Sequence, residues 1–316
     1  MLFDNLLVEK YRPSKLADLV LSKKNREYFE TVRAKQEIPH VLFSGDAGIG
    51  KSTLARIIVE ELLNCQYIYI NASDESGIDT IRTKVTNFAQ TRSLDGKLKV
   101  IVLDGIDGLG RVANTGSSAQ GALRNVIEKY AETTRFIATC NYSSQLITPV
   151  RSRFLEFDLT PPYDQLAERI KFIIRQENIK VPEDQKSRLE KLVKNHYPDM
   201  RKMIGEIQRN SPKGILDLEE VEDNIAFAAK LFKKIQEKTD CVKLREFIIT
   251  NEIEFECDYH RLLRNLFEVV YKSSLKEEKK APAMLTISNK MLEHQTVMDK
   301  EINFFSCVLE LMDVLK

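Results

Sequence analysis

Short apolar runs alternate with helical patterns through the first half of the chain. Most of these runs are rich in β-branched or aromatic residues, which is typical of buried strands. Four of them are predicted strands: Val41–Phe43, Tyr67–Ile70, Val100–Leu103 and Phe136–Thr139. Helical patterns such as Ile78–Gln90 and Ala119–Tyr130 lie between them. Strands that alternate with helices favour an α/β fold, with a parallel sheet covered by helices on both faces.

The strand pattern nearly ends at Pro161-Pro162, and helical patterns follow it. Three short helices are predicted at Asp164–Gln176, Glu183–Asn195 and Met200–Arg209. After a break at Ser211–Gly214 the chain is predicted to form amphipathic helices, whose apolar stripes either build a core or face a partner subunit. The pattern predicts three domains: an α/β domain at 1–160, a small helical domain at 161–225 and an all-α domain at 226–316.

The composition indicates a soluble protein and does not by itself indicate a function. The chain has 316 residues, 43% of them hydrophobic and 30% charged, as expected for a soluble protein of two or three domains. No apolar run approaches the ~20 residues of a membrane span, and the N-terminus lacks the features of a signal peptide, so a cytoplasmic location is expected, in the host if the source is viral. The five cysteines contain no C-x-x-C pair, which argues against a disulfide framework or a zinc site. Because the net charge is only +1, DNA binding would need a local basic strip or an assembly.

The stretch Gly45–Ser52, GDAGIGKS, fits the phosphate-binding pattern G-x-x-x-x-G-K-[ST] between a predicted strand and a predicted helix. Its glycines allow backbone N–H groups to surround phosphate oxygens at a helix N-terminus. Lys51 is expected to reach the β- and γ-phosphates of ATP, and the Ser52 hydroxyl is expected to bind Mg²⁺. The predicted nucleotide-binding loop comprises Gly45, Asp46, Ala47, Gly48, Ile49, Gly50, Lys51, Ser52 and Thr53.

A second nucleotide motif lies at the end of a later strand. The run Lys99–Asp104 is hydrophobic and ends in an acid. An acid in this place holds the Mg²⁺ shell in P-loop ATPases, and its spacing of ~50 residues from the phosphate loop strengthens the match. We therefore expect Asp104 to serve Mg²⁺ together with Ser52.

Several sequence blocks resemble the AAA+ sliding-clamp-loader family. Similar blocks occur in the small subunits of eukaryotic replication factor C and in the large subunit of the T4-like bacteriophage clamp loader. The matching blocks are VEKYRP (Val8–Pro13), the phosphate loop, NASDESGIDTIR (Asn71–Arg82), AQGALRNVIEKY (Ala119–Tyr130), TCN (Thr139–Asn141) with SRF (Ser152–Phe154), and PDMRKMIGEIQ (Pro198–Gln208). The resemblance implies an AAA+ ATP-binding domain, a helical lid and a helical collar that oligomerises. Within this resemblance, the stretch Arg209–Asp217 favours the phage branch.

The same resemblance assigns roles to residues of the nucleotide site. Val8, Tyr11, Arg12 and Pro13 would line the adenine pocket. Asn141 would help to place the attacking water, and Arg201 would reach the γ-phosphate of its own subunit. Arg153 would act in trans, on the ATP of a neighbouring subunit. Guanidinium groups suit these roles because the transition state of phosphoryl transfer spreads negative charge over several oxygens.

The family also implies contacts to the phosphate backbone of DNA, which are independent of sequence and sensitive to salt. The candidates are Ser76, Gly77, Arg82, Lys84, Arg111 and Arg124. Gln120, in the block Ala-Gln-x-Ala-Leu-Arg, would link the DNA-facing helix to the ATP site. The implied partners are the other subunits of a hetero-pentamer, the sliding clamp and primer–template DNA.

Two positions depart from the family pattern. Phe154 replaces the cysteine of Ser-Arg-Cys, which is not catalytic. Gly105 replaces the glutamate that polarises the attacking water, and Asp107, two residues on, need not point at that water. The expected function is an ATP-dependent subunit that opens the clamp and loads it onto DNA. The alternative is a subunit that binds ATP without hydrolysing it and supplies Arg153 to a neighbour. A remoter alternative, another AAA+ remodeller, would usually carry an aromatic pore loop, and we find none.

Overall fold

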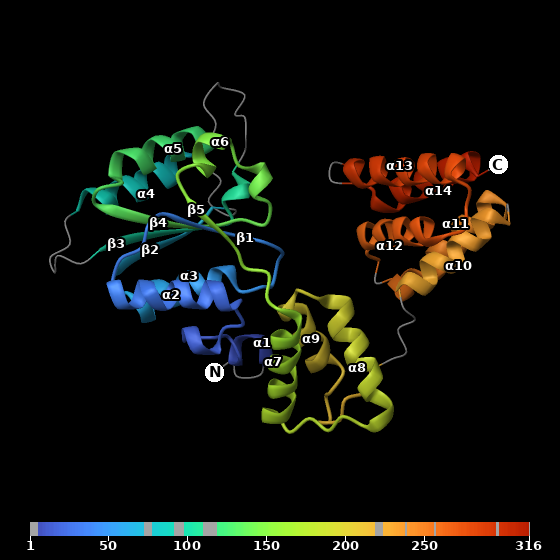
Figure 1. Ribbon diagram of the computed structural model, residues 1–316, viewed down its shortest axis with the longest axis horizontal. Helices are drawn as coiled ribbons and strands as arrows, with labels where there is room; N and C mark the ends of the chain where they lie inside the picture. Colours follow the sequence, from blue (N-terminus) through green and yellow to red (C-terminus); the bar gives the residue numbers. More distant parts are fainter. Residues whose placement is uncertain are drawn as a thin grey trace. The chain divides into compact units, whose positions relative to one another are not determined.

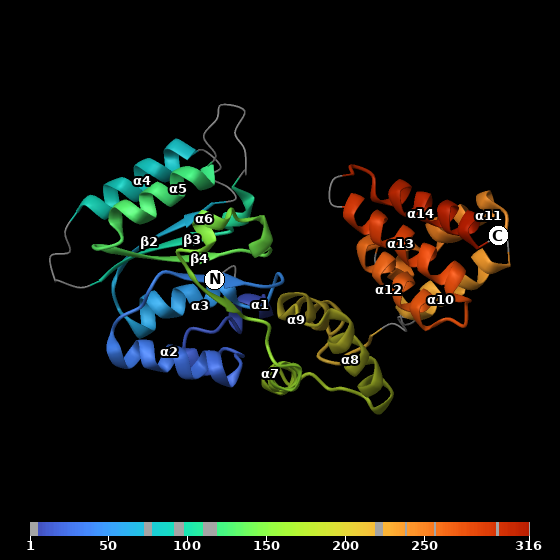
Figure 2. The ribbon, with the colours of Figure 1, turned by 45° about the horizontal axis from the view of Figure 1, so that its top comes forward.

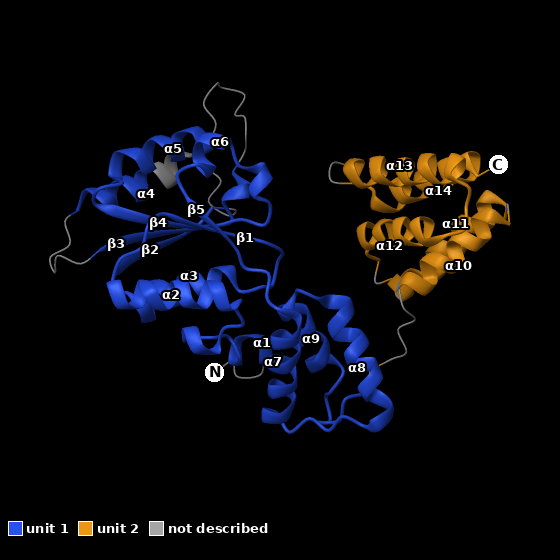
Figure 3. Ribbon diagram, in the orientation of Figure 1, with its two compact units in different colours: residues 1–217 blue, residues 218–316 orange. Residues whose placement is uncertain are grey.

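The chain separates into two compact units in a computed structural model, residues 1–217 and residues 218–316 (Figure 3). The structure describes residues 6–72, 78–91, 98–109, 119–218, 224–237, 239–255, 257–294 and 297–315. Each unit has its own hydrophobic core, and each is described by itself. Among the described residues, no helix is both long enough and apolar enough to span a membrane.

The first unit is built on a five-stranded parallel sheet with the order β2-β3-β4-β1-β5. The strands are β1 (Val41–Ser44), β2 (Gln66–Asn71), β3 (Lys99–Asp104), β4 (Thr134–Thr139) and β5 (Leu155–Asp158). The predicted parallel sheet is confirmed. The sequence did not predict β5, a four-residue strand with no buried position at the edge of the sheet. Such a strand carries little hydrophobic signal.

Helices cover both faces of this sheet (Figures 1 and 2). On one face lie α4 (Ile78–Gln90), α5 (Ala119–Tyr130) and the short α6 (Thr148–Arg151). On the other lie α2 (Lys23–Lys35) and α3 (Lys51–Ile57), which continues as a π-helical turn over Ile58–Leu62. The two layers match two core clusters, one on each side of the sheet, because alternate strand residues point to opposite faces.

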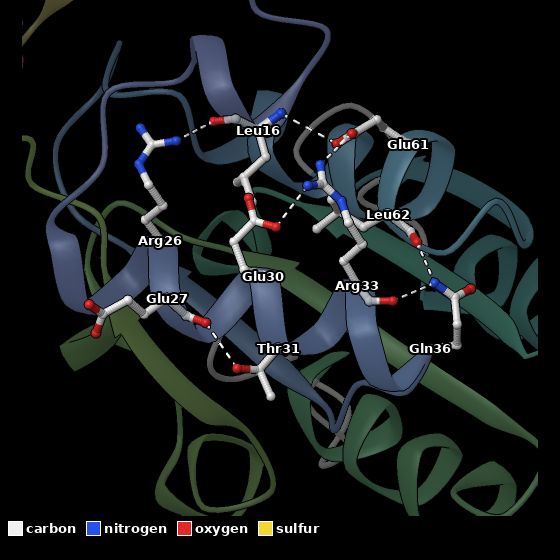
Figure 4. A network of polar contacts seen from close by, with 9 residues as sticks. All are labelled: Leu16, Arg26, Glu27, Glu30, Thr31, Arg33, Gln36, Glu61 and Leu62. Atoms are coloured by element: carbon white, nitrogen blue, oxygen red, sulfur yellow. Dashed lines mark hydrogen bonds and ion pairs between the residues drawn. The ribbon is translucent and has the colours of Figure 1, made fainter.

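A network of polar contacts fixes the segment before α2 against the α2–α3 layer (Figure 4). Arg26 donates to the carbonyl oxygens of Leu16 at 2.8 Å and Leu19 at 2.7 Å. The backbone N–H of Leu16 donates to Glu61, which also pairs with Arg33. This segment is therefore held beside the phosphate loop, where a Leu19 methyl group would lie 3.0 Å from a Cβ atom at Gly50.

The remainder of the first unit is helical. Three helices follow the sheet: α7 (Tyr163–Gln176), α8 (Glu183–His196) and α9 (Met200–Arg209). Asp199 caps α9 by accepting a hydrogen bond from the Lys202 N–H at 2.9 Å. The N-terminal helix α1 (Leu7–Lys10) packs on α9, and the Leu7 N–H donates to Gln208 Oε1 at 3.0 Å.

The second unit is entirely helical in its described residues. Its helices are α10 (Asn224–Gln236), α11 (Cys241–Thr250), α12 (Tyr259–Lys272), α13 (Glu277–Glu293) and α14 (Lys300–Val314). Helix α12 contacts α10, α13 and α14, and the core is filled by aromatic side chains such as Phe227, Phe255 and Phe304. The predicted helical C-terminal region is confirmed. The predicted domain boundaries at residues 160 and 225 stay predictions.

Candidate nucleotide-binding site

The phosphate loop joins β1 to α3 at the carboxyl edge of the sheet. Gly48 and Gly50 have φ angles of +74° and +98°, a region that glycine adopts at little steric cost. A Cβ atom at Gly48 would also overlap the carboxylate of Asp199. The loop thus depends on glycine for its backbone conformation and for its close approach to the helix that follows Asp199.

Lys51 begins α3, and its side chain is buried in the loop. Its Nζ atom donates to the carbonyl oxygens of Gly45 and Asp46, each at 2.7 Å, and to Asn141 Oδ1 at 2.8 Å. Burial lowers the pKa of the Lys51 ammonium, and nearby carboxylates such as Asp107 and Asp104 oppose this shift. The structure therefore brings Lys51 and Asn141, which are 90 positions apart, into direct contact.

Ser52 and Asp104, the two predicted Mg²⁺ residues, also meet. Ser52 Oγ donates to Asp104 Oδ1 at 2.9 Å. The Thr139 hydroxyl donates to the same carboxylate oxygen, and the phenol of Tyr69 donates to Asp104 Oδ2. Burial and this hydrogen bond raise the pKa of Tyr69 to about 12. The hydroxyl and carboxylate oxygens are of the type that Mg²⁺ prefers, so the residues present fit this ion.

The residues after Asp104 are engaged with the loop that carries Asn141. Gly105 has a φ angle of +73°, and its N–H donates to Thr139 Oγ1 at 2.9 Å. Asp107 Oδ2 accepts the backbone N–H groups of Asn141 at 2.8 Å and Tyr142 at 3.1 Å. The carboxylate of Asp107 therefore holds the backbone of the Asn141 loop, a role that the sequence did not reveal.

One pocket is lined by residues of the phosphate loop, of the N-terminal segment and of the helices after the sheet. Its lining includes the predicted residues Val8, Tyr11, Arg12, Pro13, Gly48, Ile49, Gly50, Lys51, Ser52, Thr53 and Arg201. The sequence missed five further lining residues, Glu9, Val20, Pro161, Leu166 and Met200. Glu9 and Met200 lie within the matching blocks Val8–Pro13 and Pro198–Gln208, which could have indicated them, whereas Val20, Pro161 and Leu166 belong to no motif of a nucleotide site. We call this the nucleotide pocket.

Tyr11 connects the N-terminal segment to α7. Its phenol donates to Glu177 Oε1, and Lys10 pairs with the same oxygen at 2.7 Å. Burial, followed by this hydrogen bond, raises the pKa of Tyr11 to about 12, so the phenol stays protonated at neutral pH. Glu177 was not predicted, because a glutamate at the end of a surface helix carries no sequence signal.

Arg153 is not among the residues that line the nucleotide pocket. It lies in a different hollow, with Lys35, His40, Arg135 and Phe154. Its guanidinium donates to the Pro149 carbonyl and pairs with Glu128 of α5. The structure thus separates Arg153 from the residues around Lys51.

Gln120 is fully buried at the start of α5. Its Nε2 donates to the Leu109 carbonyl at 3.0 Å and the Gln145 carbonyl at 3.2 Å, and its Oε1 accepts the Ile147 N–H at 2.7 Å. Leu109 follows β3, whereas Gln145 and Ile147 follow β4 and Asn141. One amide side chain therefore joins α5 to the segments that continue from Asp104 and Asn141.

Of the predicted DNA contacts, Arg82 and Lys84 belong to α4 and Arg124 belongs to α5. Ser76, Gly77 and Arg111 lie outside the described residues, as does the side chain of Arg82. Lys84 is exposed on α4. Arg124 is half-buried on α5 and donates to Asn125 Oδ1 at 3.0 Å. These positions stay predictions.

Comparisons with known proteins match two successive regions of the chain. Residues 41–161 match the ATPase family associated with various cellular activities (AAA). Residues 163–219 match the AAA+ ATPase lid domain of the sliding-clamp-loader large subunit.

Two replication factor C small subunits illustrate the similarity over longer stretches. A replication factor C small subunit of Methanococcus maripaludis is 33% identical over 288 residues, which cover 86% of this chain and 87% of that protein. One of Sulfurisphaera tokodaii is 40% identical over 222 residues, which cover 68% of this chain and 65% of that protein.

Among solved structures, the RuvB Holliday junction branch migration motor of Thermotoga maritima is similar in fold. The TM-score is 0.51 at 19% identity, over 75% of this chain and 85% of that one.

Proposed function

Because this chain belongs to the replication factor C small-subunit family of AAA+ proteins, we propose that it is an ATP-binding subunit of a sliding-clamp loader. The observation that carries the proposal is the meeting of Lys51, Asn141 and the Ser52–Asp104 pair beside the nucleotide pocket. The match of residues 163–219 to a clamp-loader lid supports this assignment over other AAA+ classes.

The residues of the nucleotide pocket suit each part of ATP. Val8, Tyr11, Arg12 and Pro13 would enclose the adenine, and the backbone of Gly45–Thr53 would surround the phosphates. Lys51 would exchange its carbonyl partners for β- and γ-phosphate oxygens. Ser52 and Asp104 would hold Mg²⁺, which neutralises phosphate charge when bound.

Three residues would take part in hydrolysis. Asn141 and Arg201 would act on the ATP bound to their own subunit, and Arg153 would act on the ATP of a neighbouring subunit. Asn141, which already contacts Lys51, would help to place the attacking water. Arg201 is exposed in the first turn of α9, lines the nucleotide pocket and would stabilise the γ-phosphate. The separate location of Arg153 supports a role in trans, on the ATP of a neighbouring subunit.

A second candidate function differs in the chemical step. Gly105 offers no carboxylate, and the Asp107 carboxylate is engaged by two backbone N–H groups. Both observations favour a subunit that binds ATP, promotes assembly and supplies Arg153, while contributing little hydrolysis of its own. The two candidates share every nucleotide contact and differ only in turnover.

The proposed function also requires contacts with DNA and with the other subunits. We infer that Ser76, Gly77, Arg82, Lys84, Arg111 and Arg124 contact phosphates of primer–template DNA. Since the net charge of one chain is +1, strong binding would require several subunits side by side. Gln120 would transmit DNA binding to the ATP site through its bonds to the loops after β3 and β4.

The test is reconstitution from the native source. The chain should co-purify in a complex whose mass corresponds to a hetero-pentamer, and the complex should load a ring-shaped clamp onto primed DNA only with ATP. DNA affinity should fall steeply with added salt and vary little with sequence. A monomeric chain that binds DNA tightly without nucleotide would overturn the proposal.

A further inference from the structure

Tyr69 contacts the predicted Mg²⁺ residue Asp104 from a neighbouring strand. The tyrosine belongs to β2, which pairs in parallel with β3 so that Asn71 lies opposite Asp104. Its phenol donates to Asp104 Oδ2, whereas Ser52 and Thr139 donate to Oδ1. The two oxygens of the carboxylate therefore receive hydrogen bonds from different elements of the fold.

This division of donors fixes the rotation of the carboxylate. Ser52 lies on α3 and Thr139 at the end of β4, so both Oδ1 donors are set by the sheet and the phosphate loop. Without a donor at Oδ2, the side chain would keep only the contacts at Oδ1 and could turn about its terminal torsion, which is broad for aspartate. The phenol thus selects one orientation of the acid.

Tyr69 is itself held in place by the surrounding fold. Its ring is half-buried against the cluster that contains α3, and the guanidinium of Arg56 lies 4.9 Å from the ring centroid. A cation over an aromatic ring is an attractive contact that does not use the hydroxyl group. The packing of the ring therefore holds Tyr69 in place without the hydrogen bond from its phenol to Asp104.

We propose that Tyr69 is a positioning residue for the Mg²⁺ that accompanies ATP, acting by holding Asp104 Oδ2 so that Oδ1 stays beside Ser52. The inference rests on the proposed function, because it presumes that Mg-ATP binds at Ser52 and Asp104. Loss of a partner that orients a metal ligand typically costs roughly 10–100-fold in metal affinity. Tyr69 should therefore set the Mg²⁺ requirement of nucleotide binding and leave Mg²⁺-free affinity unchanged.

The experiment measures binding of ATPγS to the full chain across a series of Mg²⁺ concentrations and in EDTA. Tyr69→Phe keeps the ring and its contact with Arg56 and removes only the hydroxyl. It should raise the half-saturating Mg²⁺ concentration about tenfold, with the same affinity as the wild type in EDTA. Unchanged Mg²⁺ dependence, or an equal loss of affinity in EDTA, would overturn the inference.

Tyr67→Phe is the matched control. Tyr67 lies on the same face of β2, but its phenol donates to Glu60 in the π-helical turn, away from Asp104. This variant should match the wild type at every Mg²⁺ concentration, and a shift equal to that of Tyr69→Phe would contradict the specific role of Tyr69.

A double variant shows whether Tyr69 acts through Asp104. In an Asp104→Asn background, Tyr69→Phe should have no further effect on the Mg²⁺ requirement, and a persistent shift would overturn the inference. If the wild-type chain fails to bind ATPγS at any Mg²⁺ concentration, the proposed function itself is wrong. If instead the wild-type chain binds ATPγS with normal Mg²⁺ dependence and Tyr69→Phe leaves that dependence unchanged, only the role of Tyr69 is wrong.

Discussion

Asp107 Oδ2 lies 2.8 Å from the backbone nitrogen of Asn141 and accepts its hydrogen bond. A second bond from Tyr142 completes this contact. Asp107, the first acid after Gly105 in the sequence, thus holds the backbone of the residue expected to place the attacking water. Both bonds go to Oδ2 and hold the carboxylate on the backbone of the Asn141 loop, so Asp107 could act as a base only through Oδ1 and from this fixed position. We therefore expect it to be a poor substitute for the missing glutamate.

We therefore expect Gly105→Glu to increase ATP turnover of the assembled complex in the presence of DNA and clamp. General-base assistance is typically worth about 10²–10⁴ in rate. The gain should be smaller, because Gly105 has a φ angle of +73° and a side chain there costs about 1 kcal/mol. Nucleotide affinity should change little. The measurement is single-turnover hydrolysis with saturating ATP.

Gly105→Gln is the matched control, since it imposes the same backbone strain and offers no base. It should fail to increase turnover. If the wild-type complex already hydrolyses ATP at full rate on every site and Gly105→Glu adds nothing, a substitute base exists and the second candidate function is wrong.

Replacement of Lys51 should abolish most nucleotide affinity. Lys51→Ala removes the cation expected to bind the β- and γ-phosphates, and a charge-assisted hydrogen bond contributes about 1.5–3 kcal/mol, which corresponds to a loss of roughly tenfold to a hundredfold. The measurement is equilibrium binding of ATPγS. Lys23→Ala, which alters an exposed lysine on α2, is the control and should bind normally. Equal affinity of the two variants would contradict the assignment of the phosphate loop.

Arg153→Ala should separate binding from turnover. The isolated variant should bind ATP like the wild type, because Arg153 does not line the nucleotide pocket. In the assembled complex, hydrolysis at the neighbouring site should fall by about 10³-fold or more, as expected for an arginine that acts in trans.

Arg151→Ala provides the comparison for Arg153, since Arg151 belongs to the same short segment and pairs with Glu156 at 2.7 Å. Its effect on turnover should be small. A loss of ATP affinity in isolated Arg153→Ala would indicate that Arg153 serves its own site.

Gln120→Met should lower stability and weaken the response to DNA. The variant removes three hydrogen bonds made by a fully buried amide, and each buried group left without a partner costs about 1–3 kcal/mol. The ratio of DNA-stimulated to basal turnover should fall, which a loss of stability alone would not produce in the folded fraction. Gln90→Met, on the exposed side of α4, should leave both quantities near wild type.

His40 should make stability depend on pH below neutrality. Burial, together with the guanidinium of Arg135, lowers the pKa of His40 from 6.5 to about 4. Between these values the unfolded chain binds more protons, so the contribution of His40 is complete above pH 6.5 and is lost as the pH falls toward 4. His40→Asn keeps an acceptor for the Phe136 N–H, which His40 Nδ1 binds at 3.1 Å, and does not titrate. Denaturant unfolding should show a shallower pH slope for the variant, and identical slopes would rule out this role for His40.

Sequence reasoning located the elements that bury a continuous apolar face. Helix α9 and helices α4 and α5 begin and end at the predicted residues, because their apolar spacing is regular. Strand β5 was missed because it is short and lies at the edge of the sheet. Helix α2 was also missed, although its own residues Phe29 and Val32 form a buried face. Local patterns also could not reveal long-range polar partners. The contacts of Asp107 with Asn141, of Tyr11 with Glu177 and of Tyr69 with Asp104 depend on how separate elements meet.

The close approach of Gly48 to Asp199 has a consequence for how this chain can evolve. A methyl group at position 48 would occupy space already taken by the Asp199 carboxylate. An alanine at 48 therefore requires the Asp199 carboxylate to turn away, which would end its cap of α9, or a shorter side chain at 199, and it must still tolerate a φ angle of +74°. Because Asp199 caps α9, a shorter residue there would keep the cap only if, like serine, it retains a capping oxygen. We therefore expect substitutions at positions 48 and 199 to depend on one another, although the two residues are far apart in the sequence.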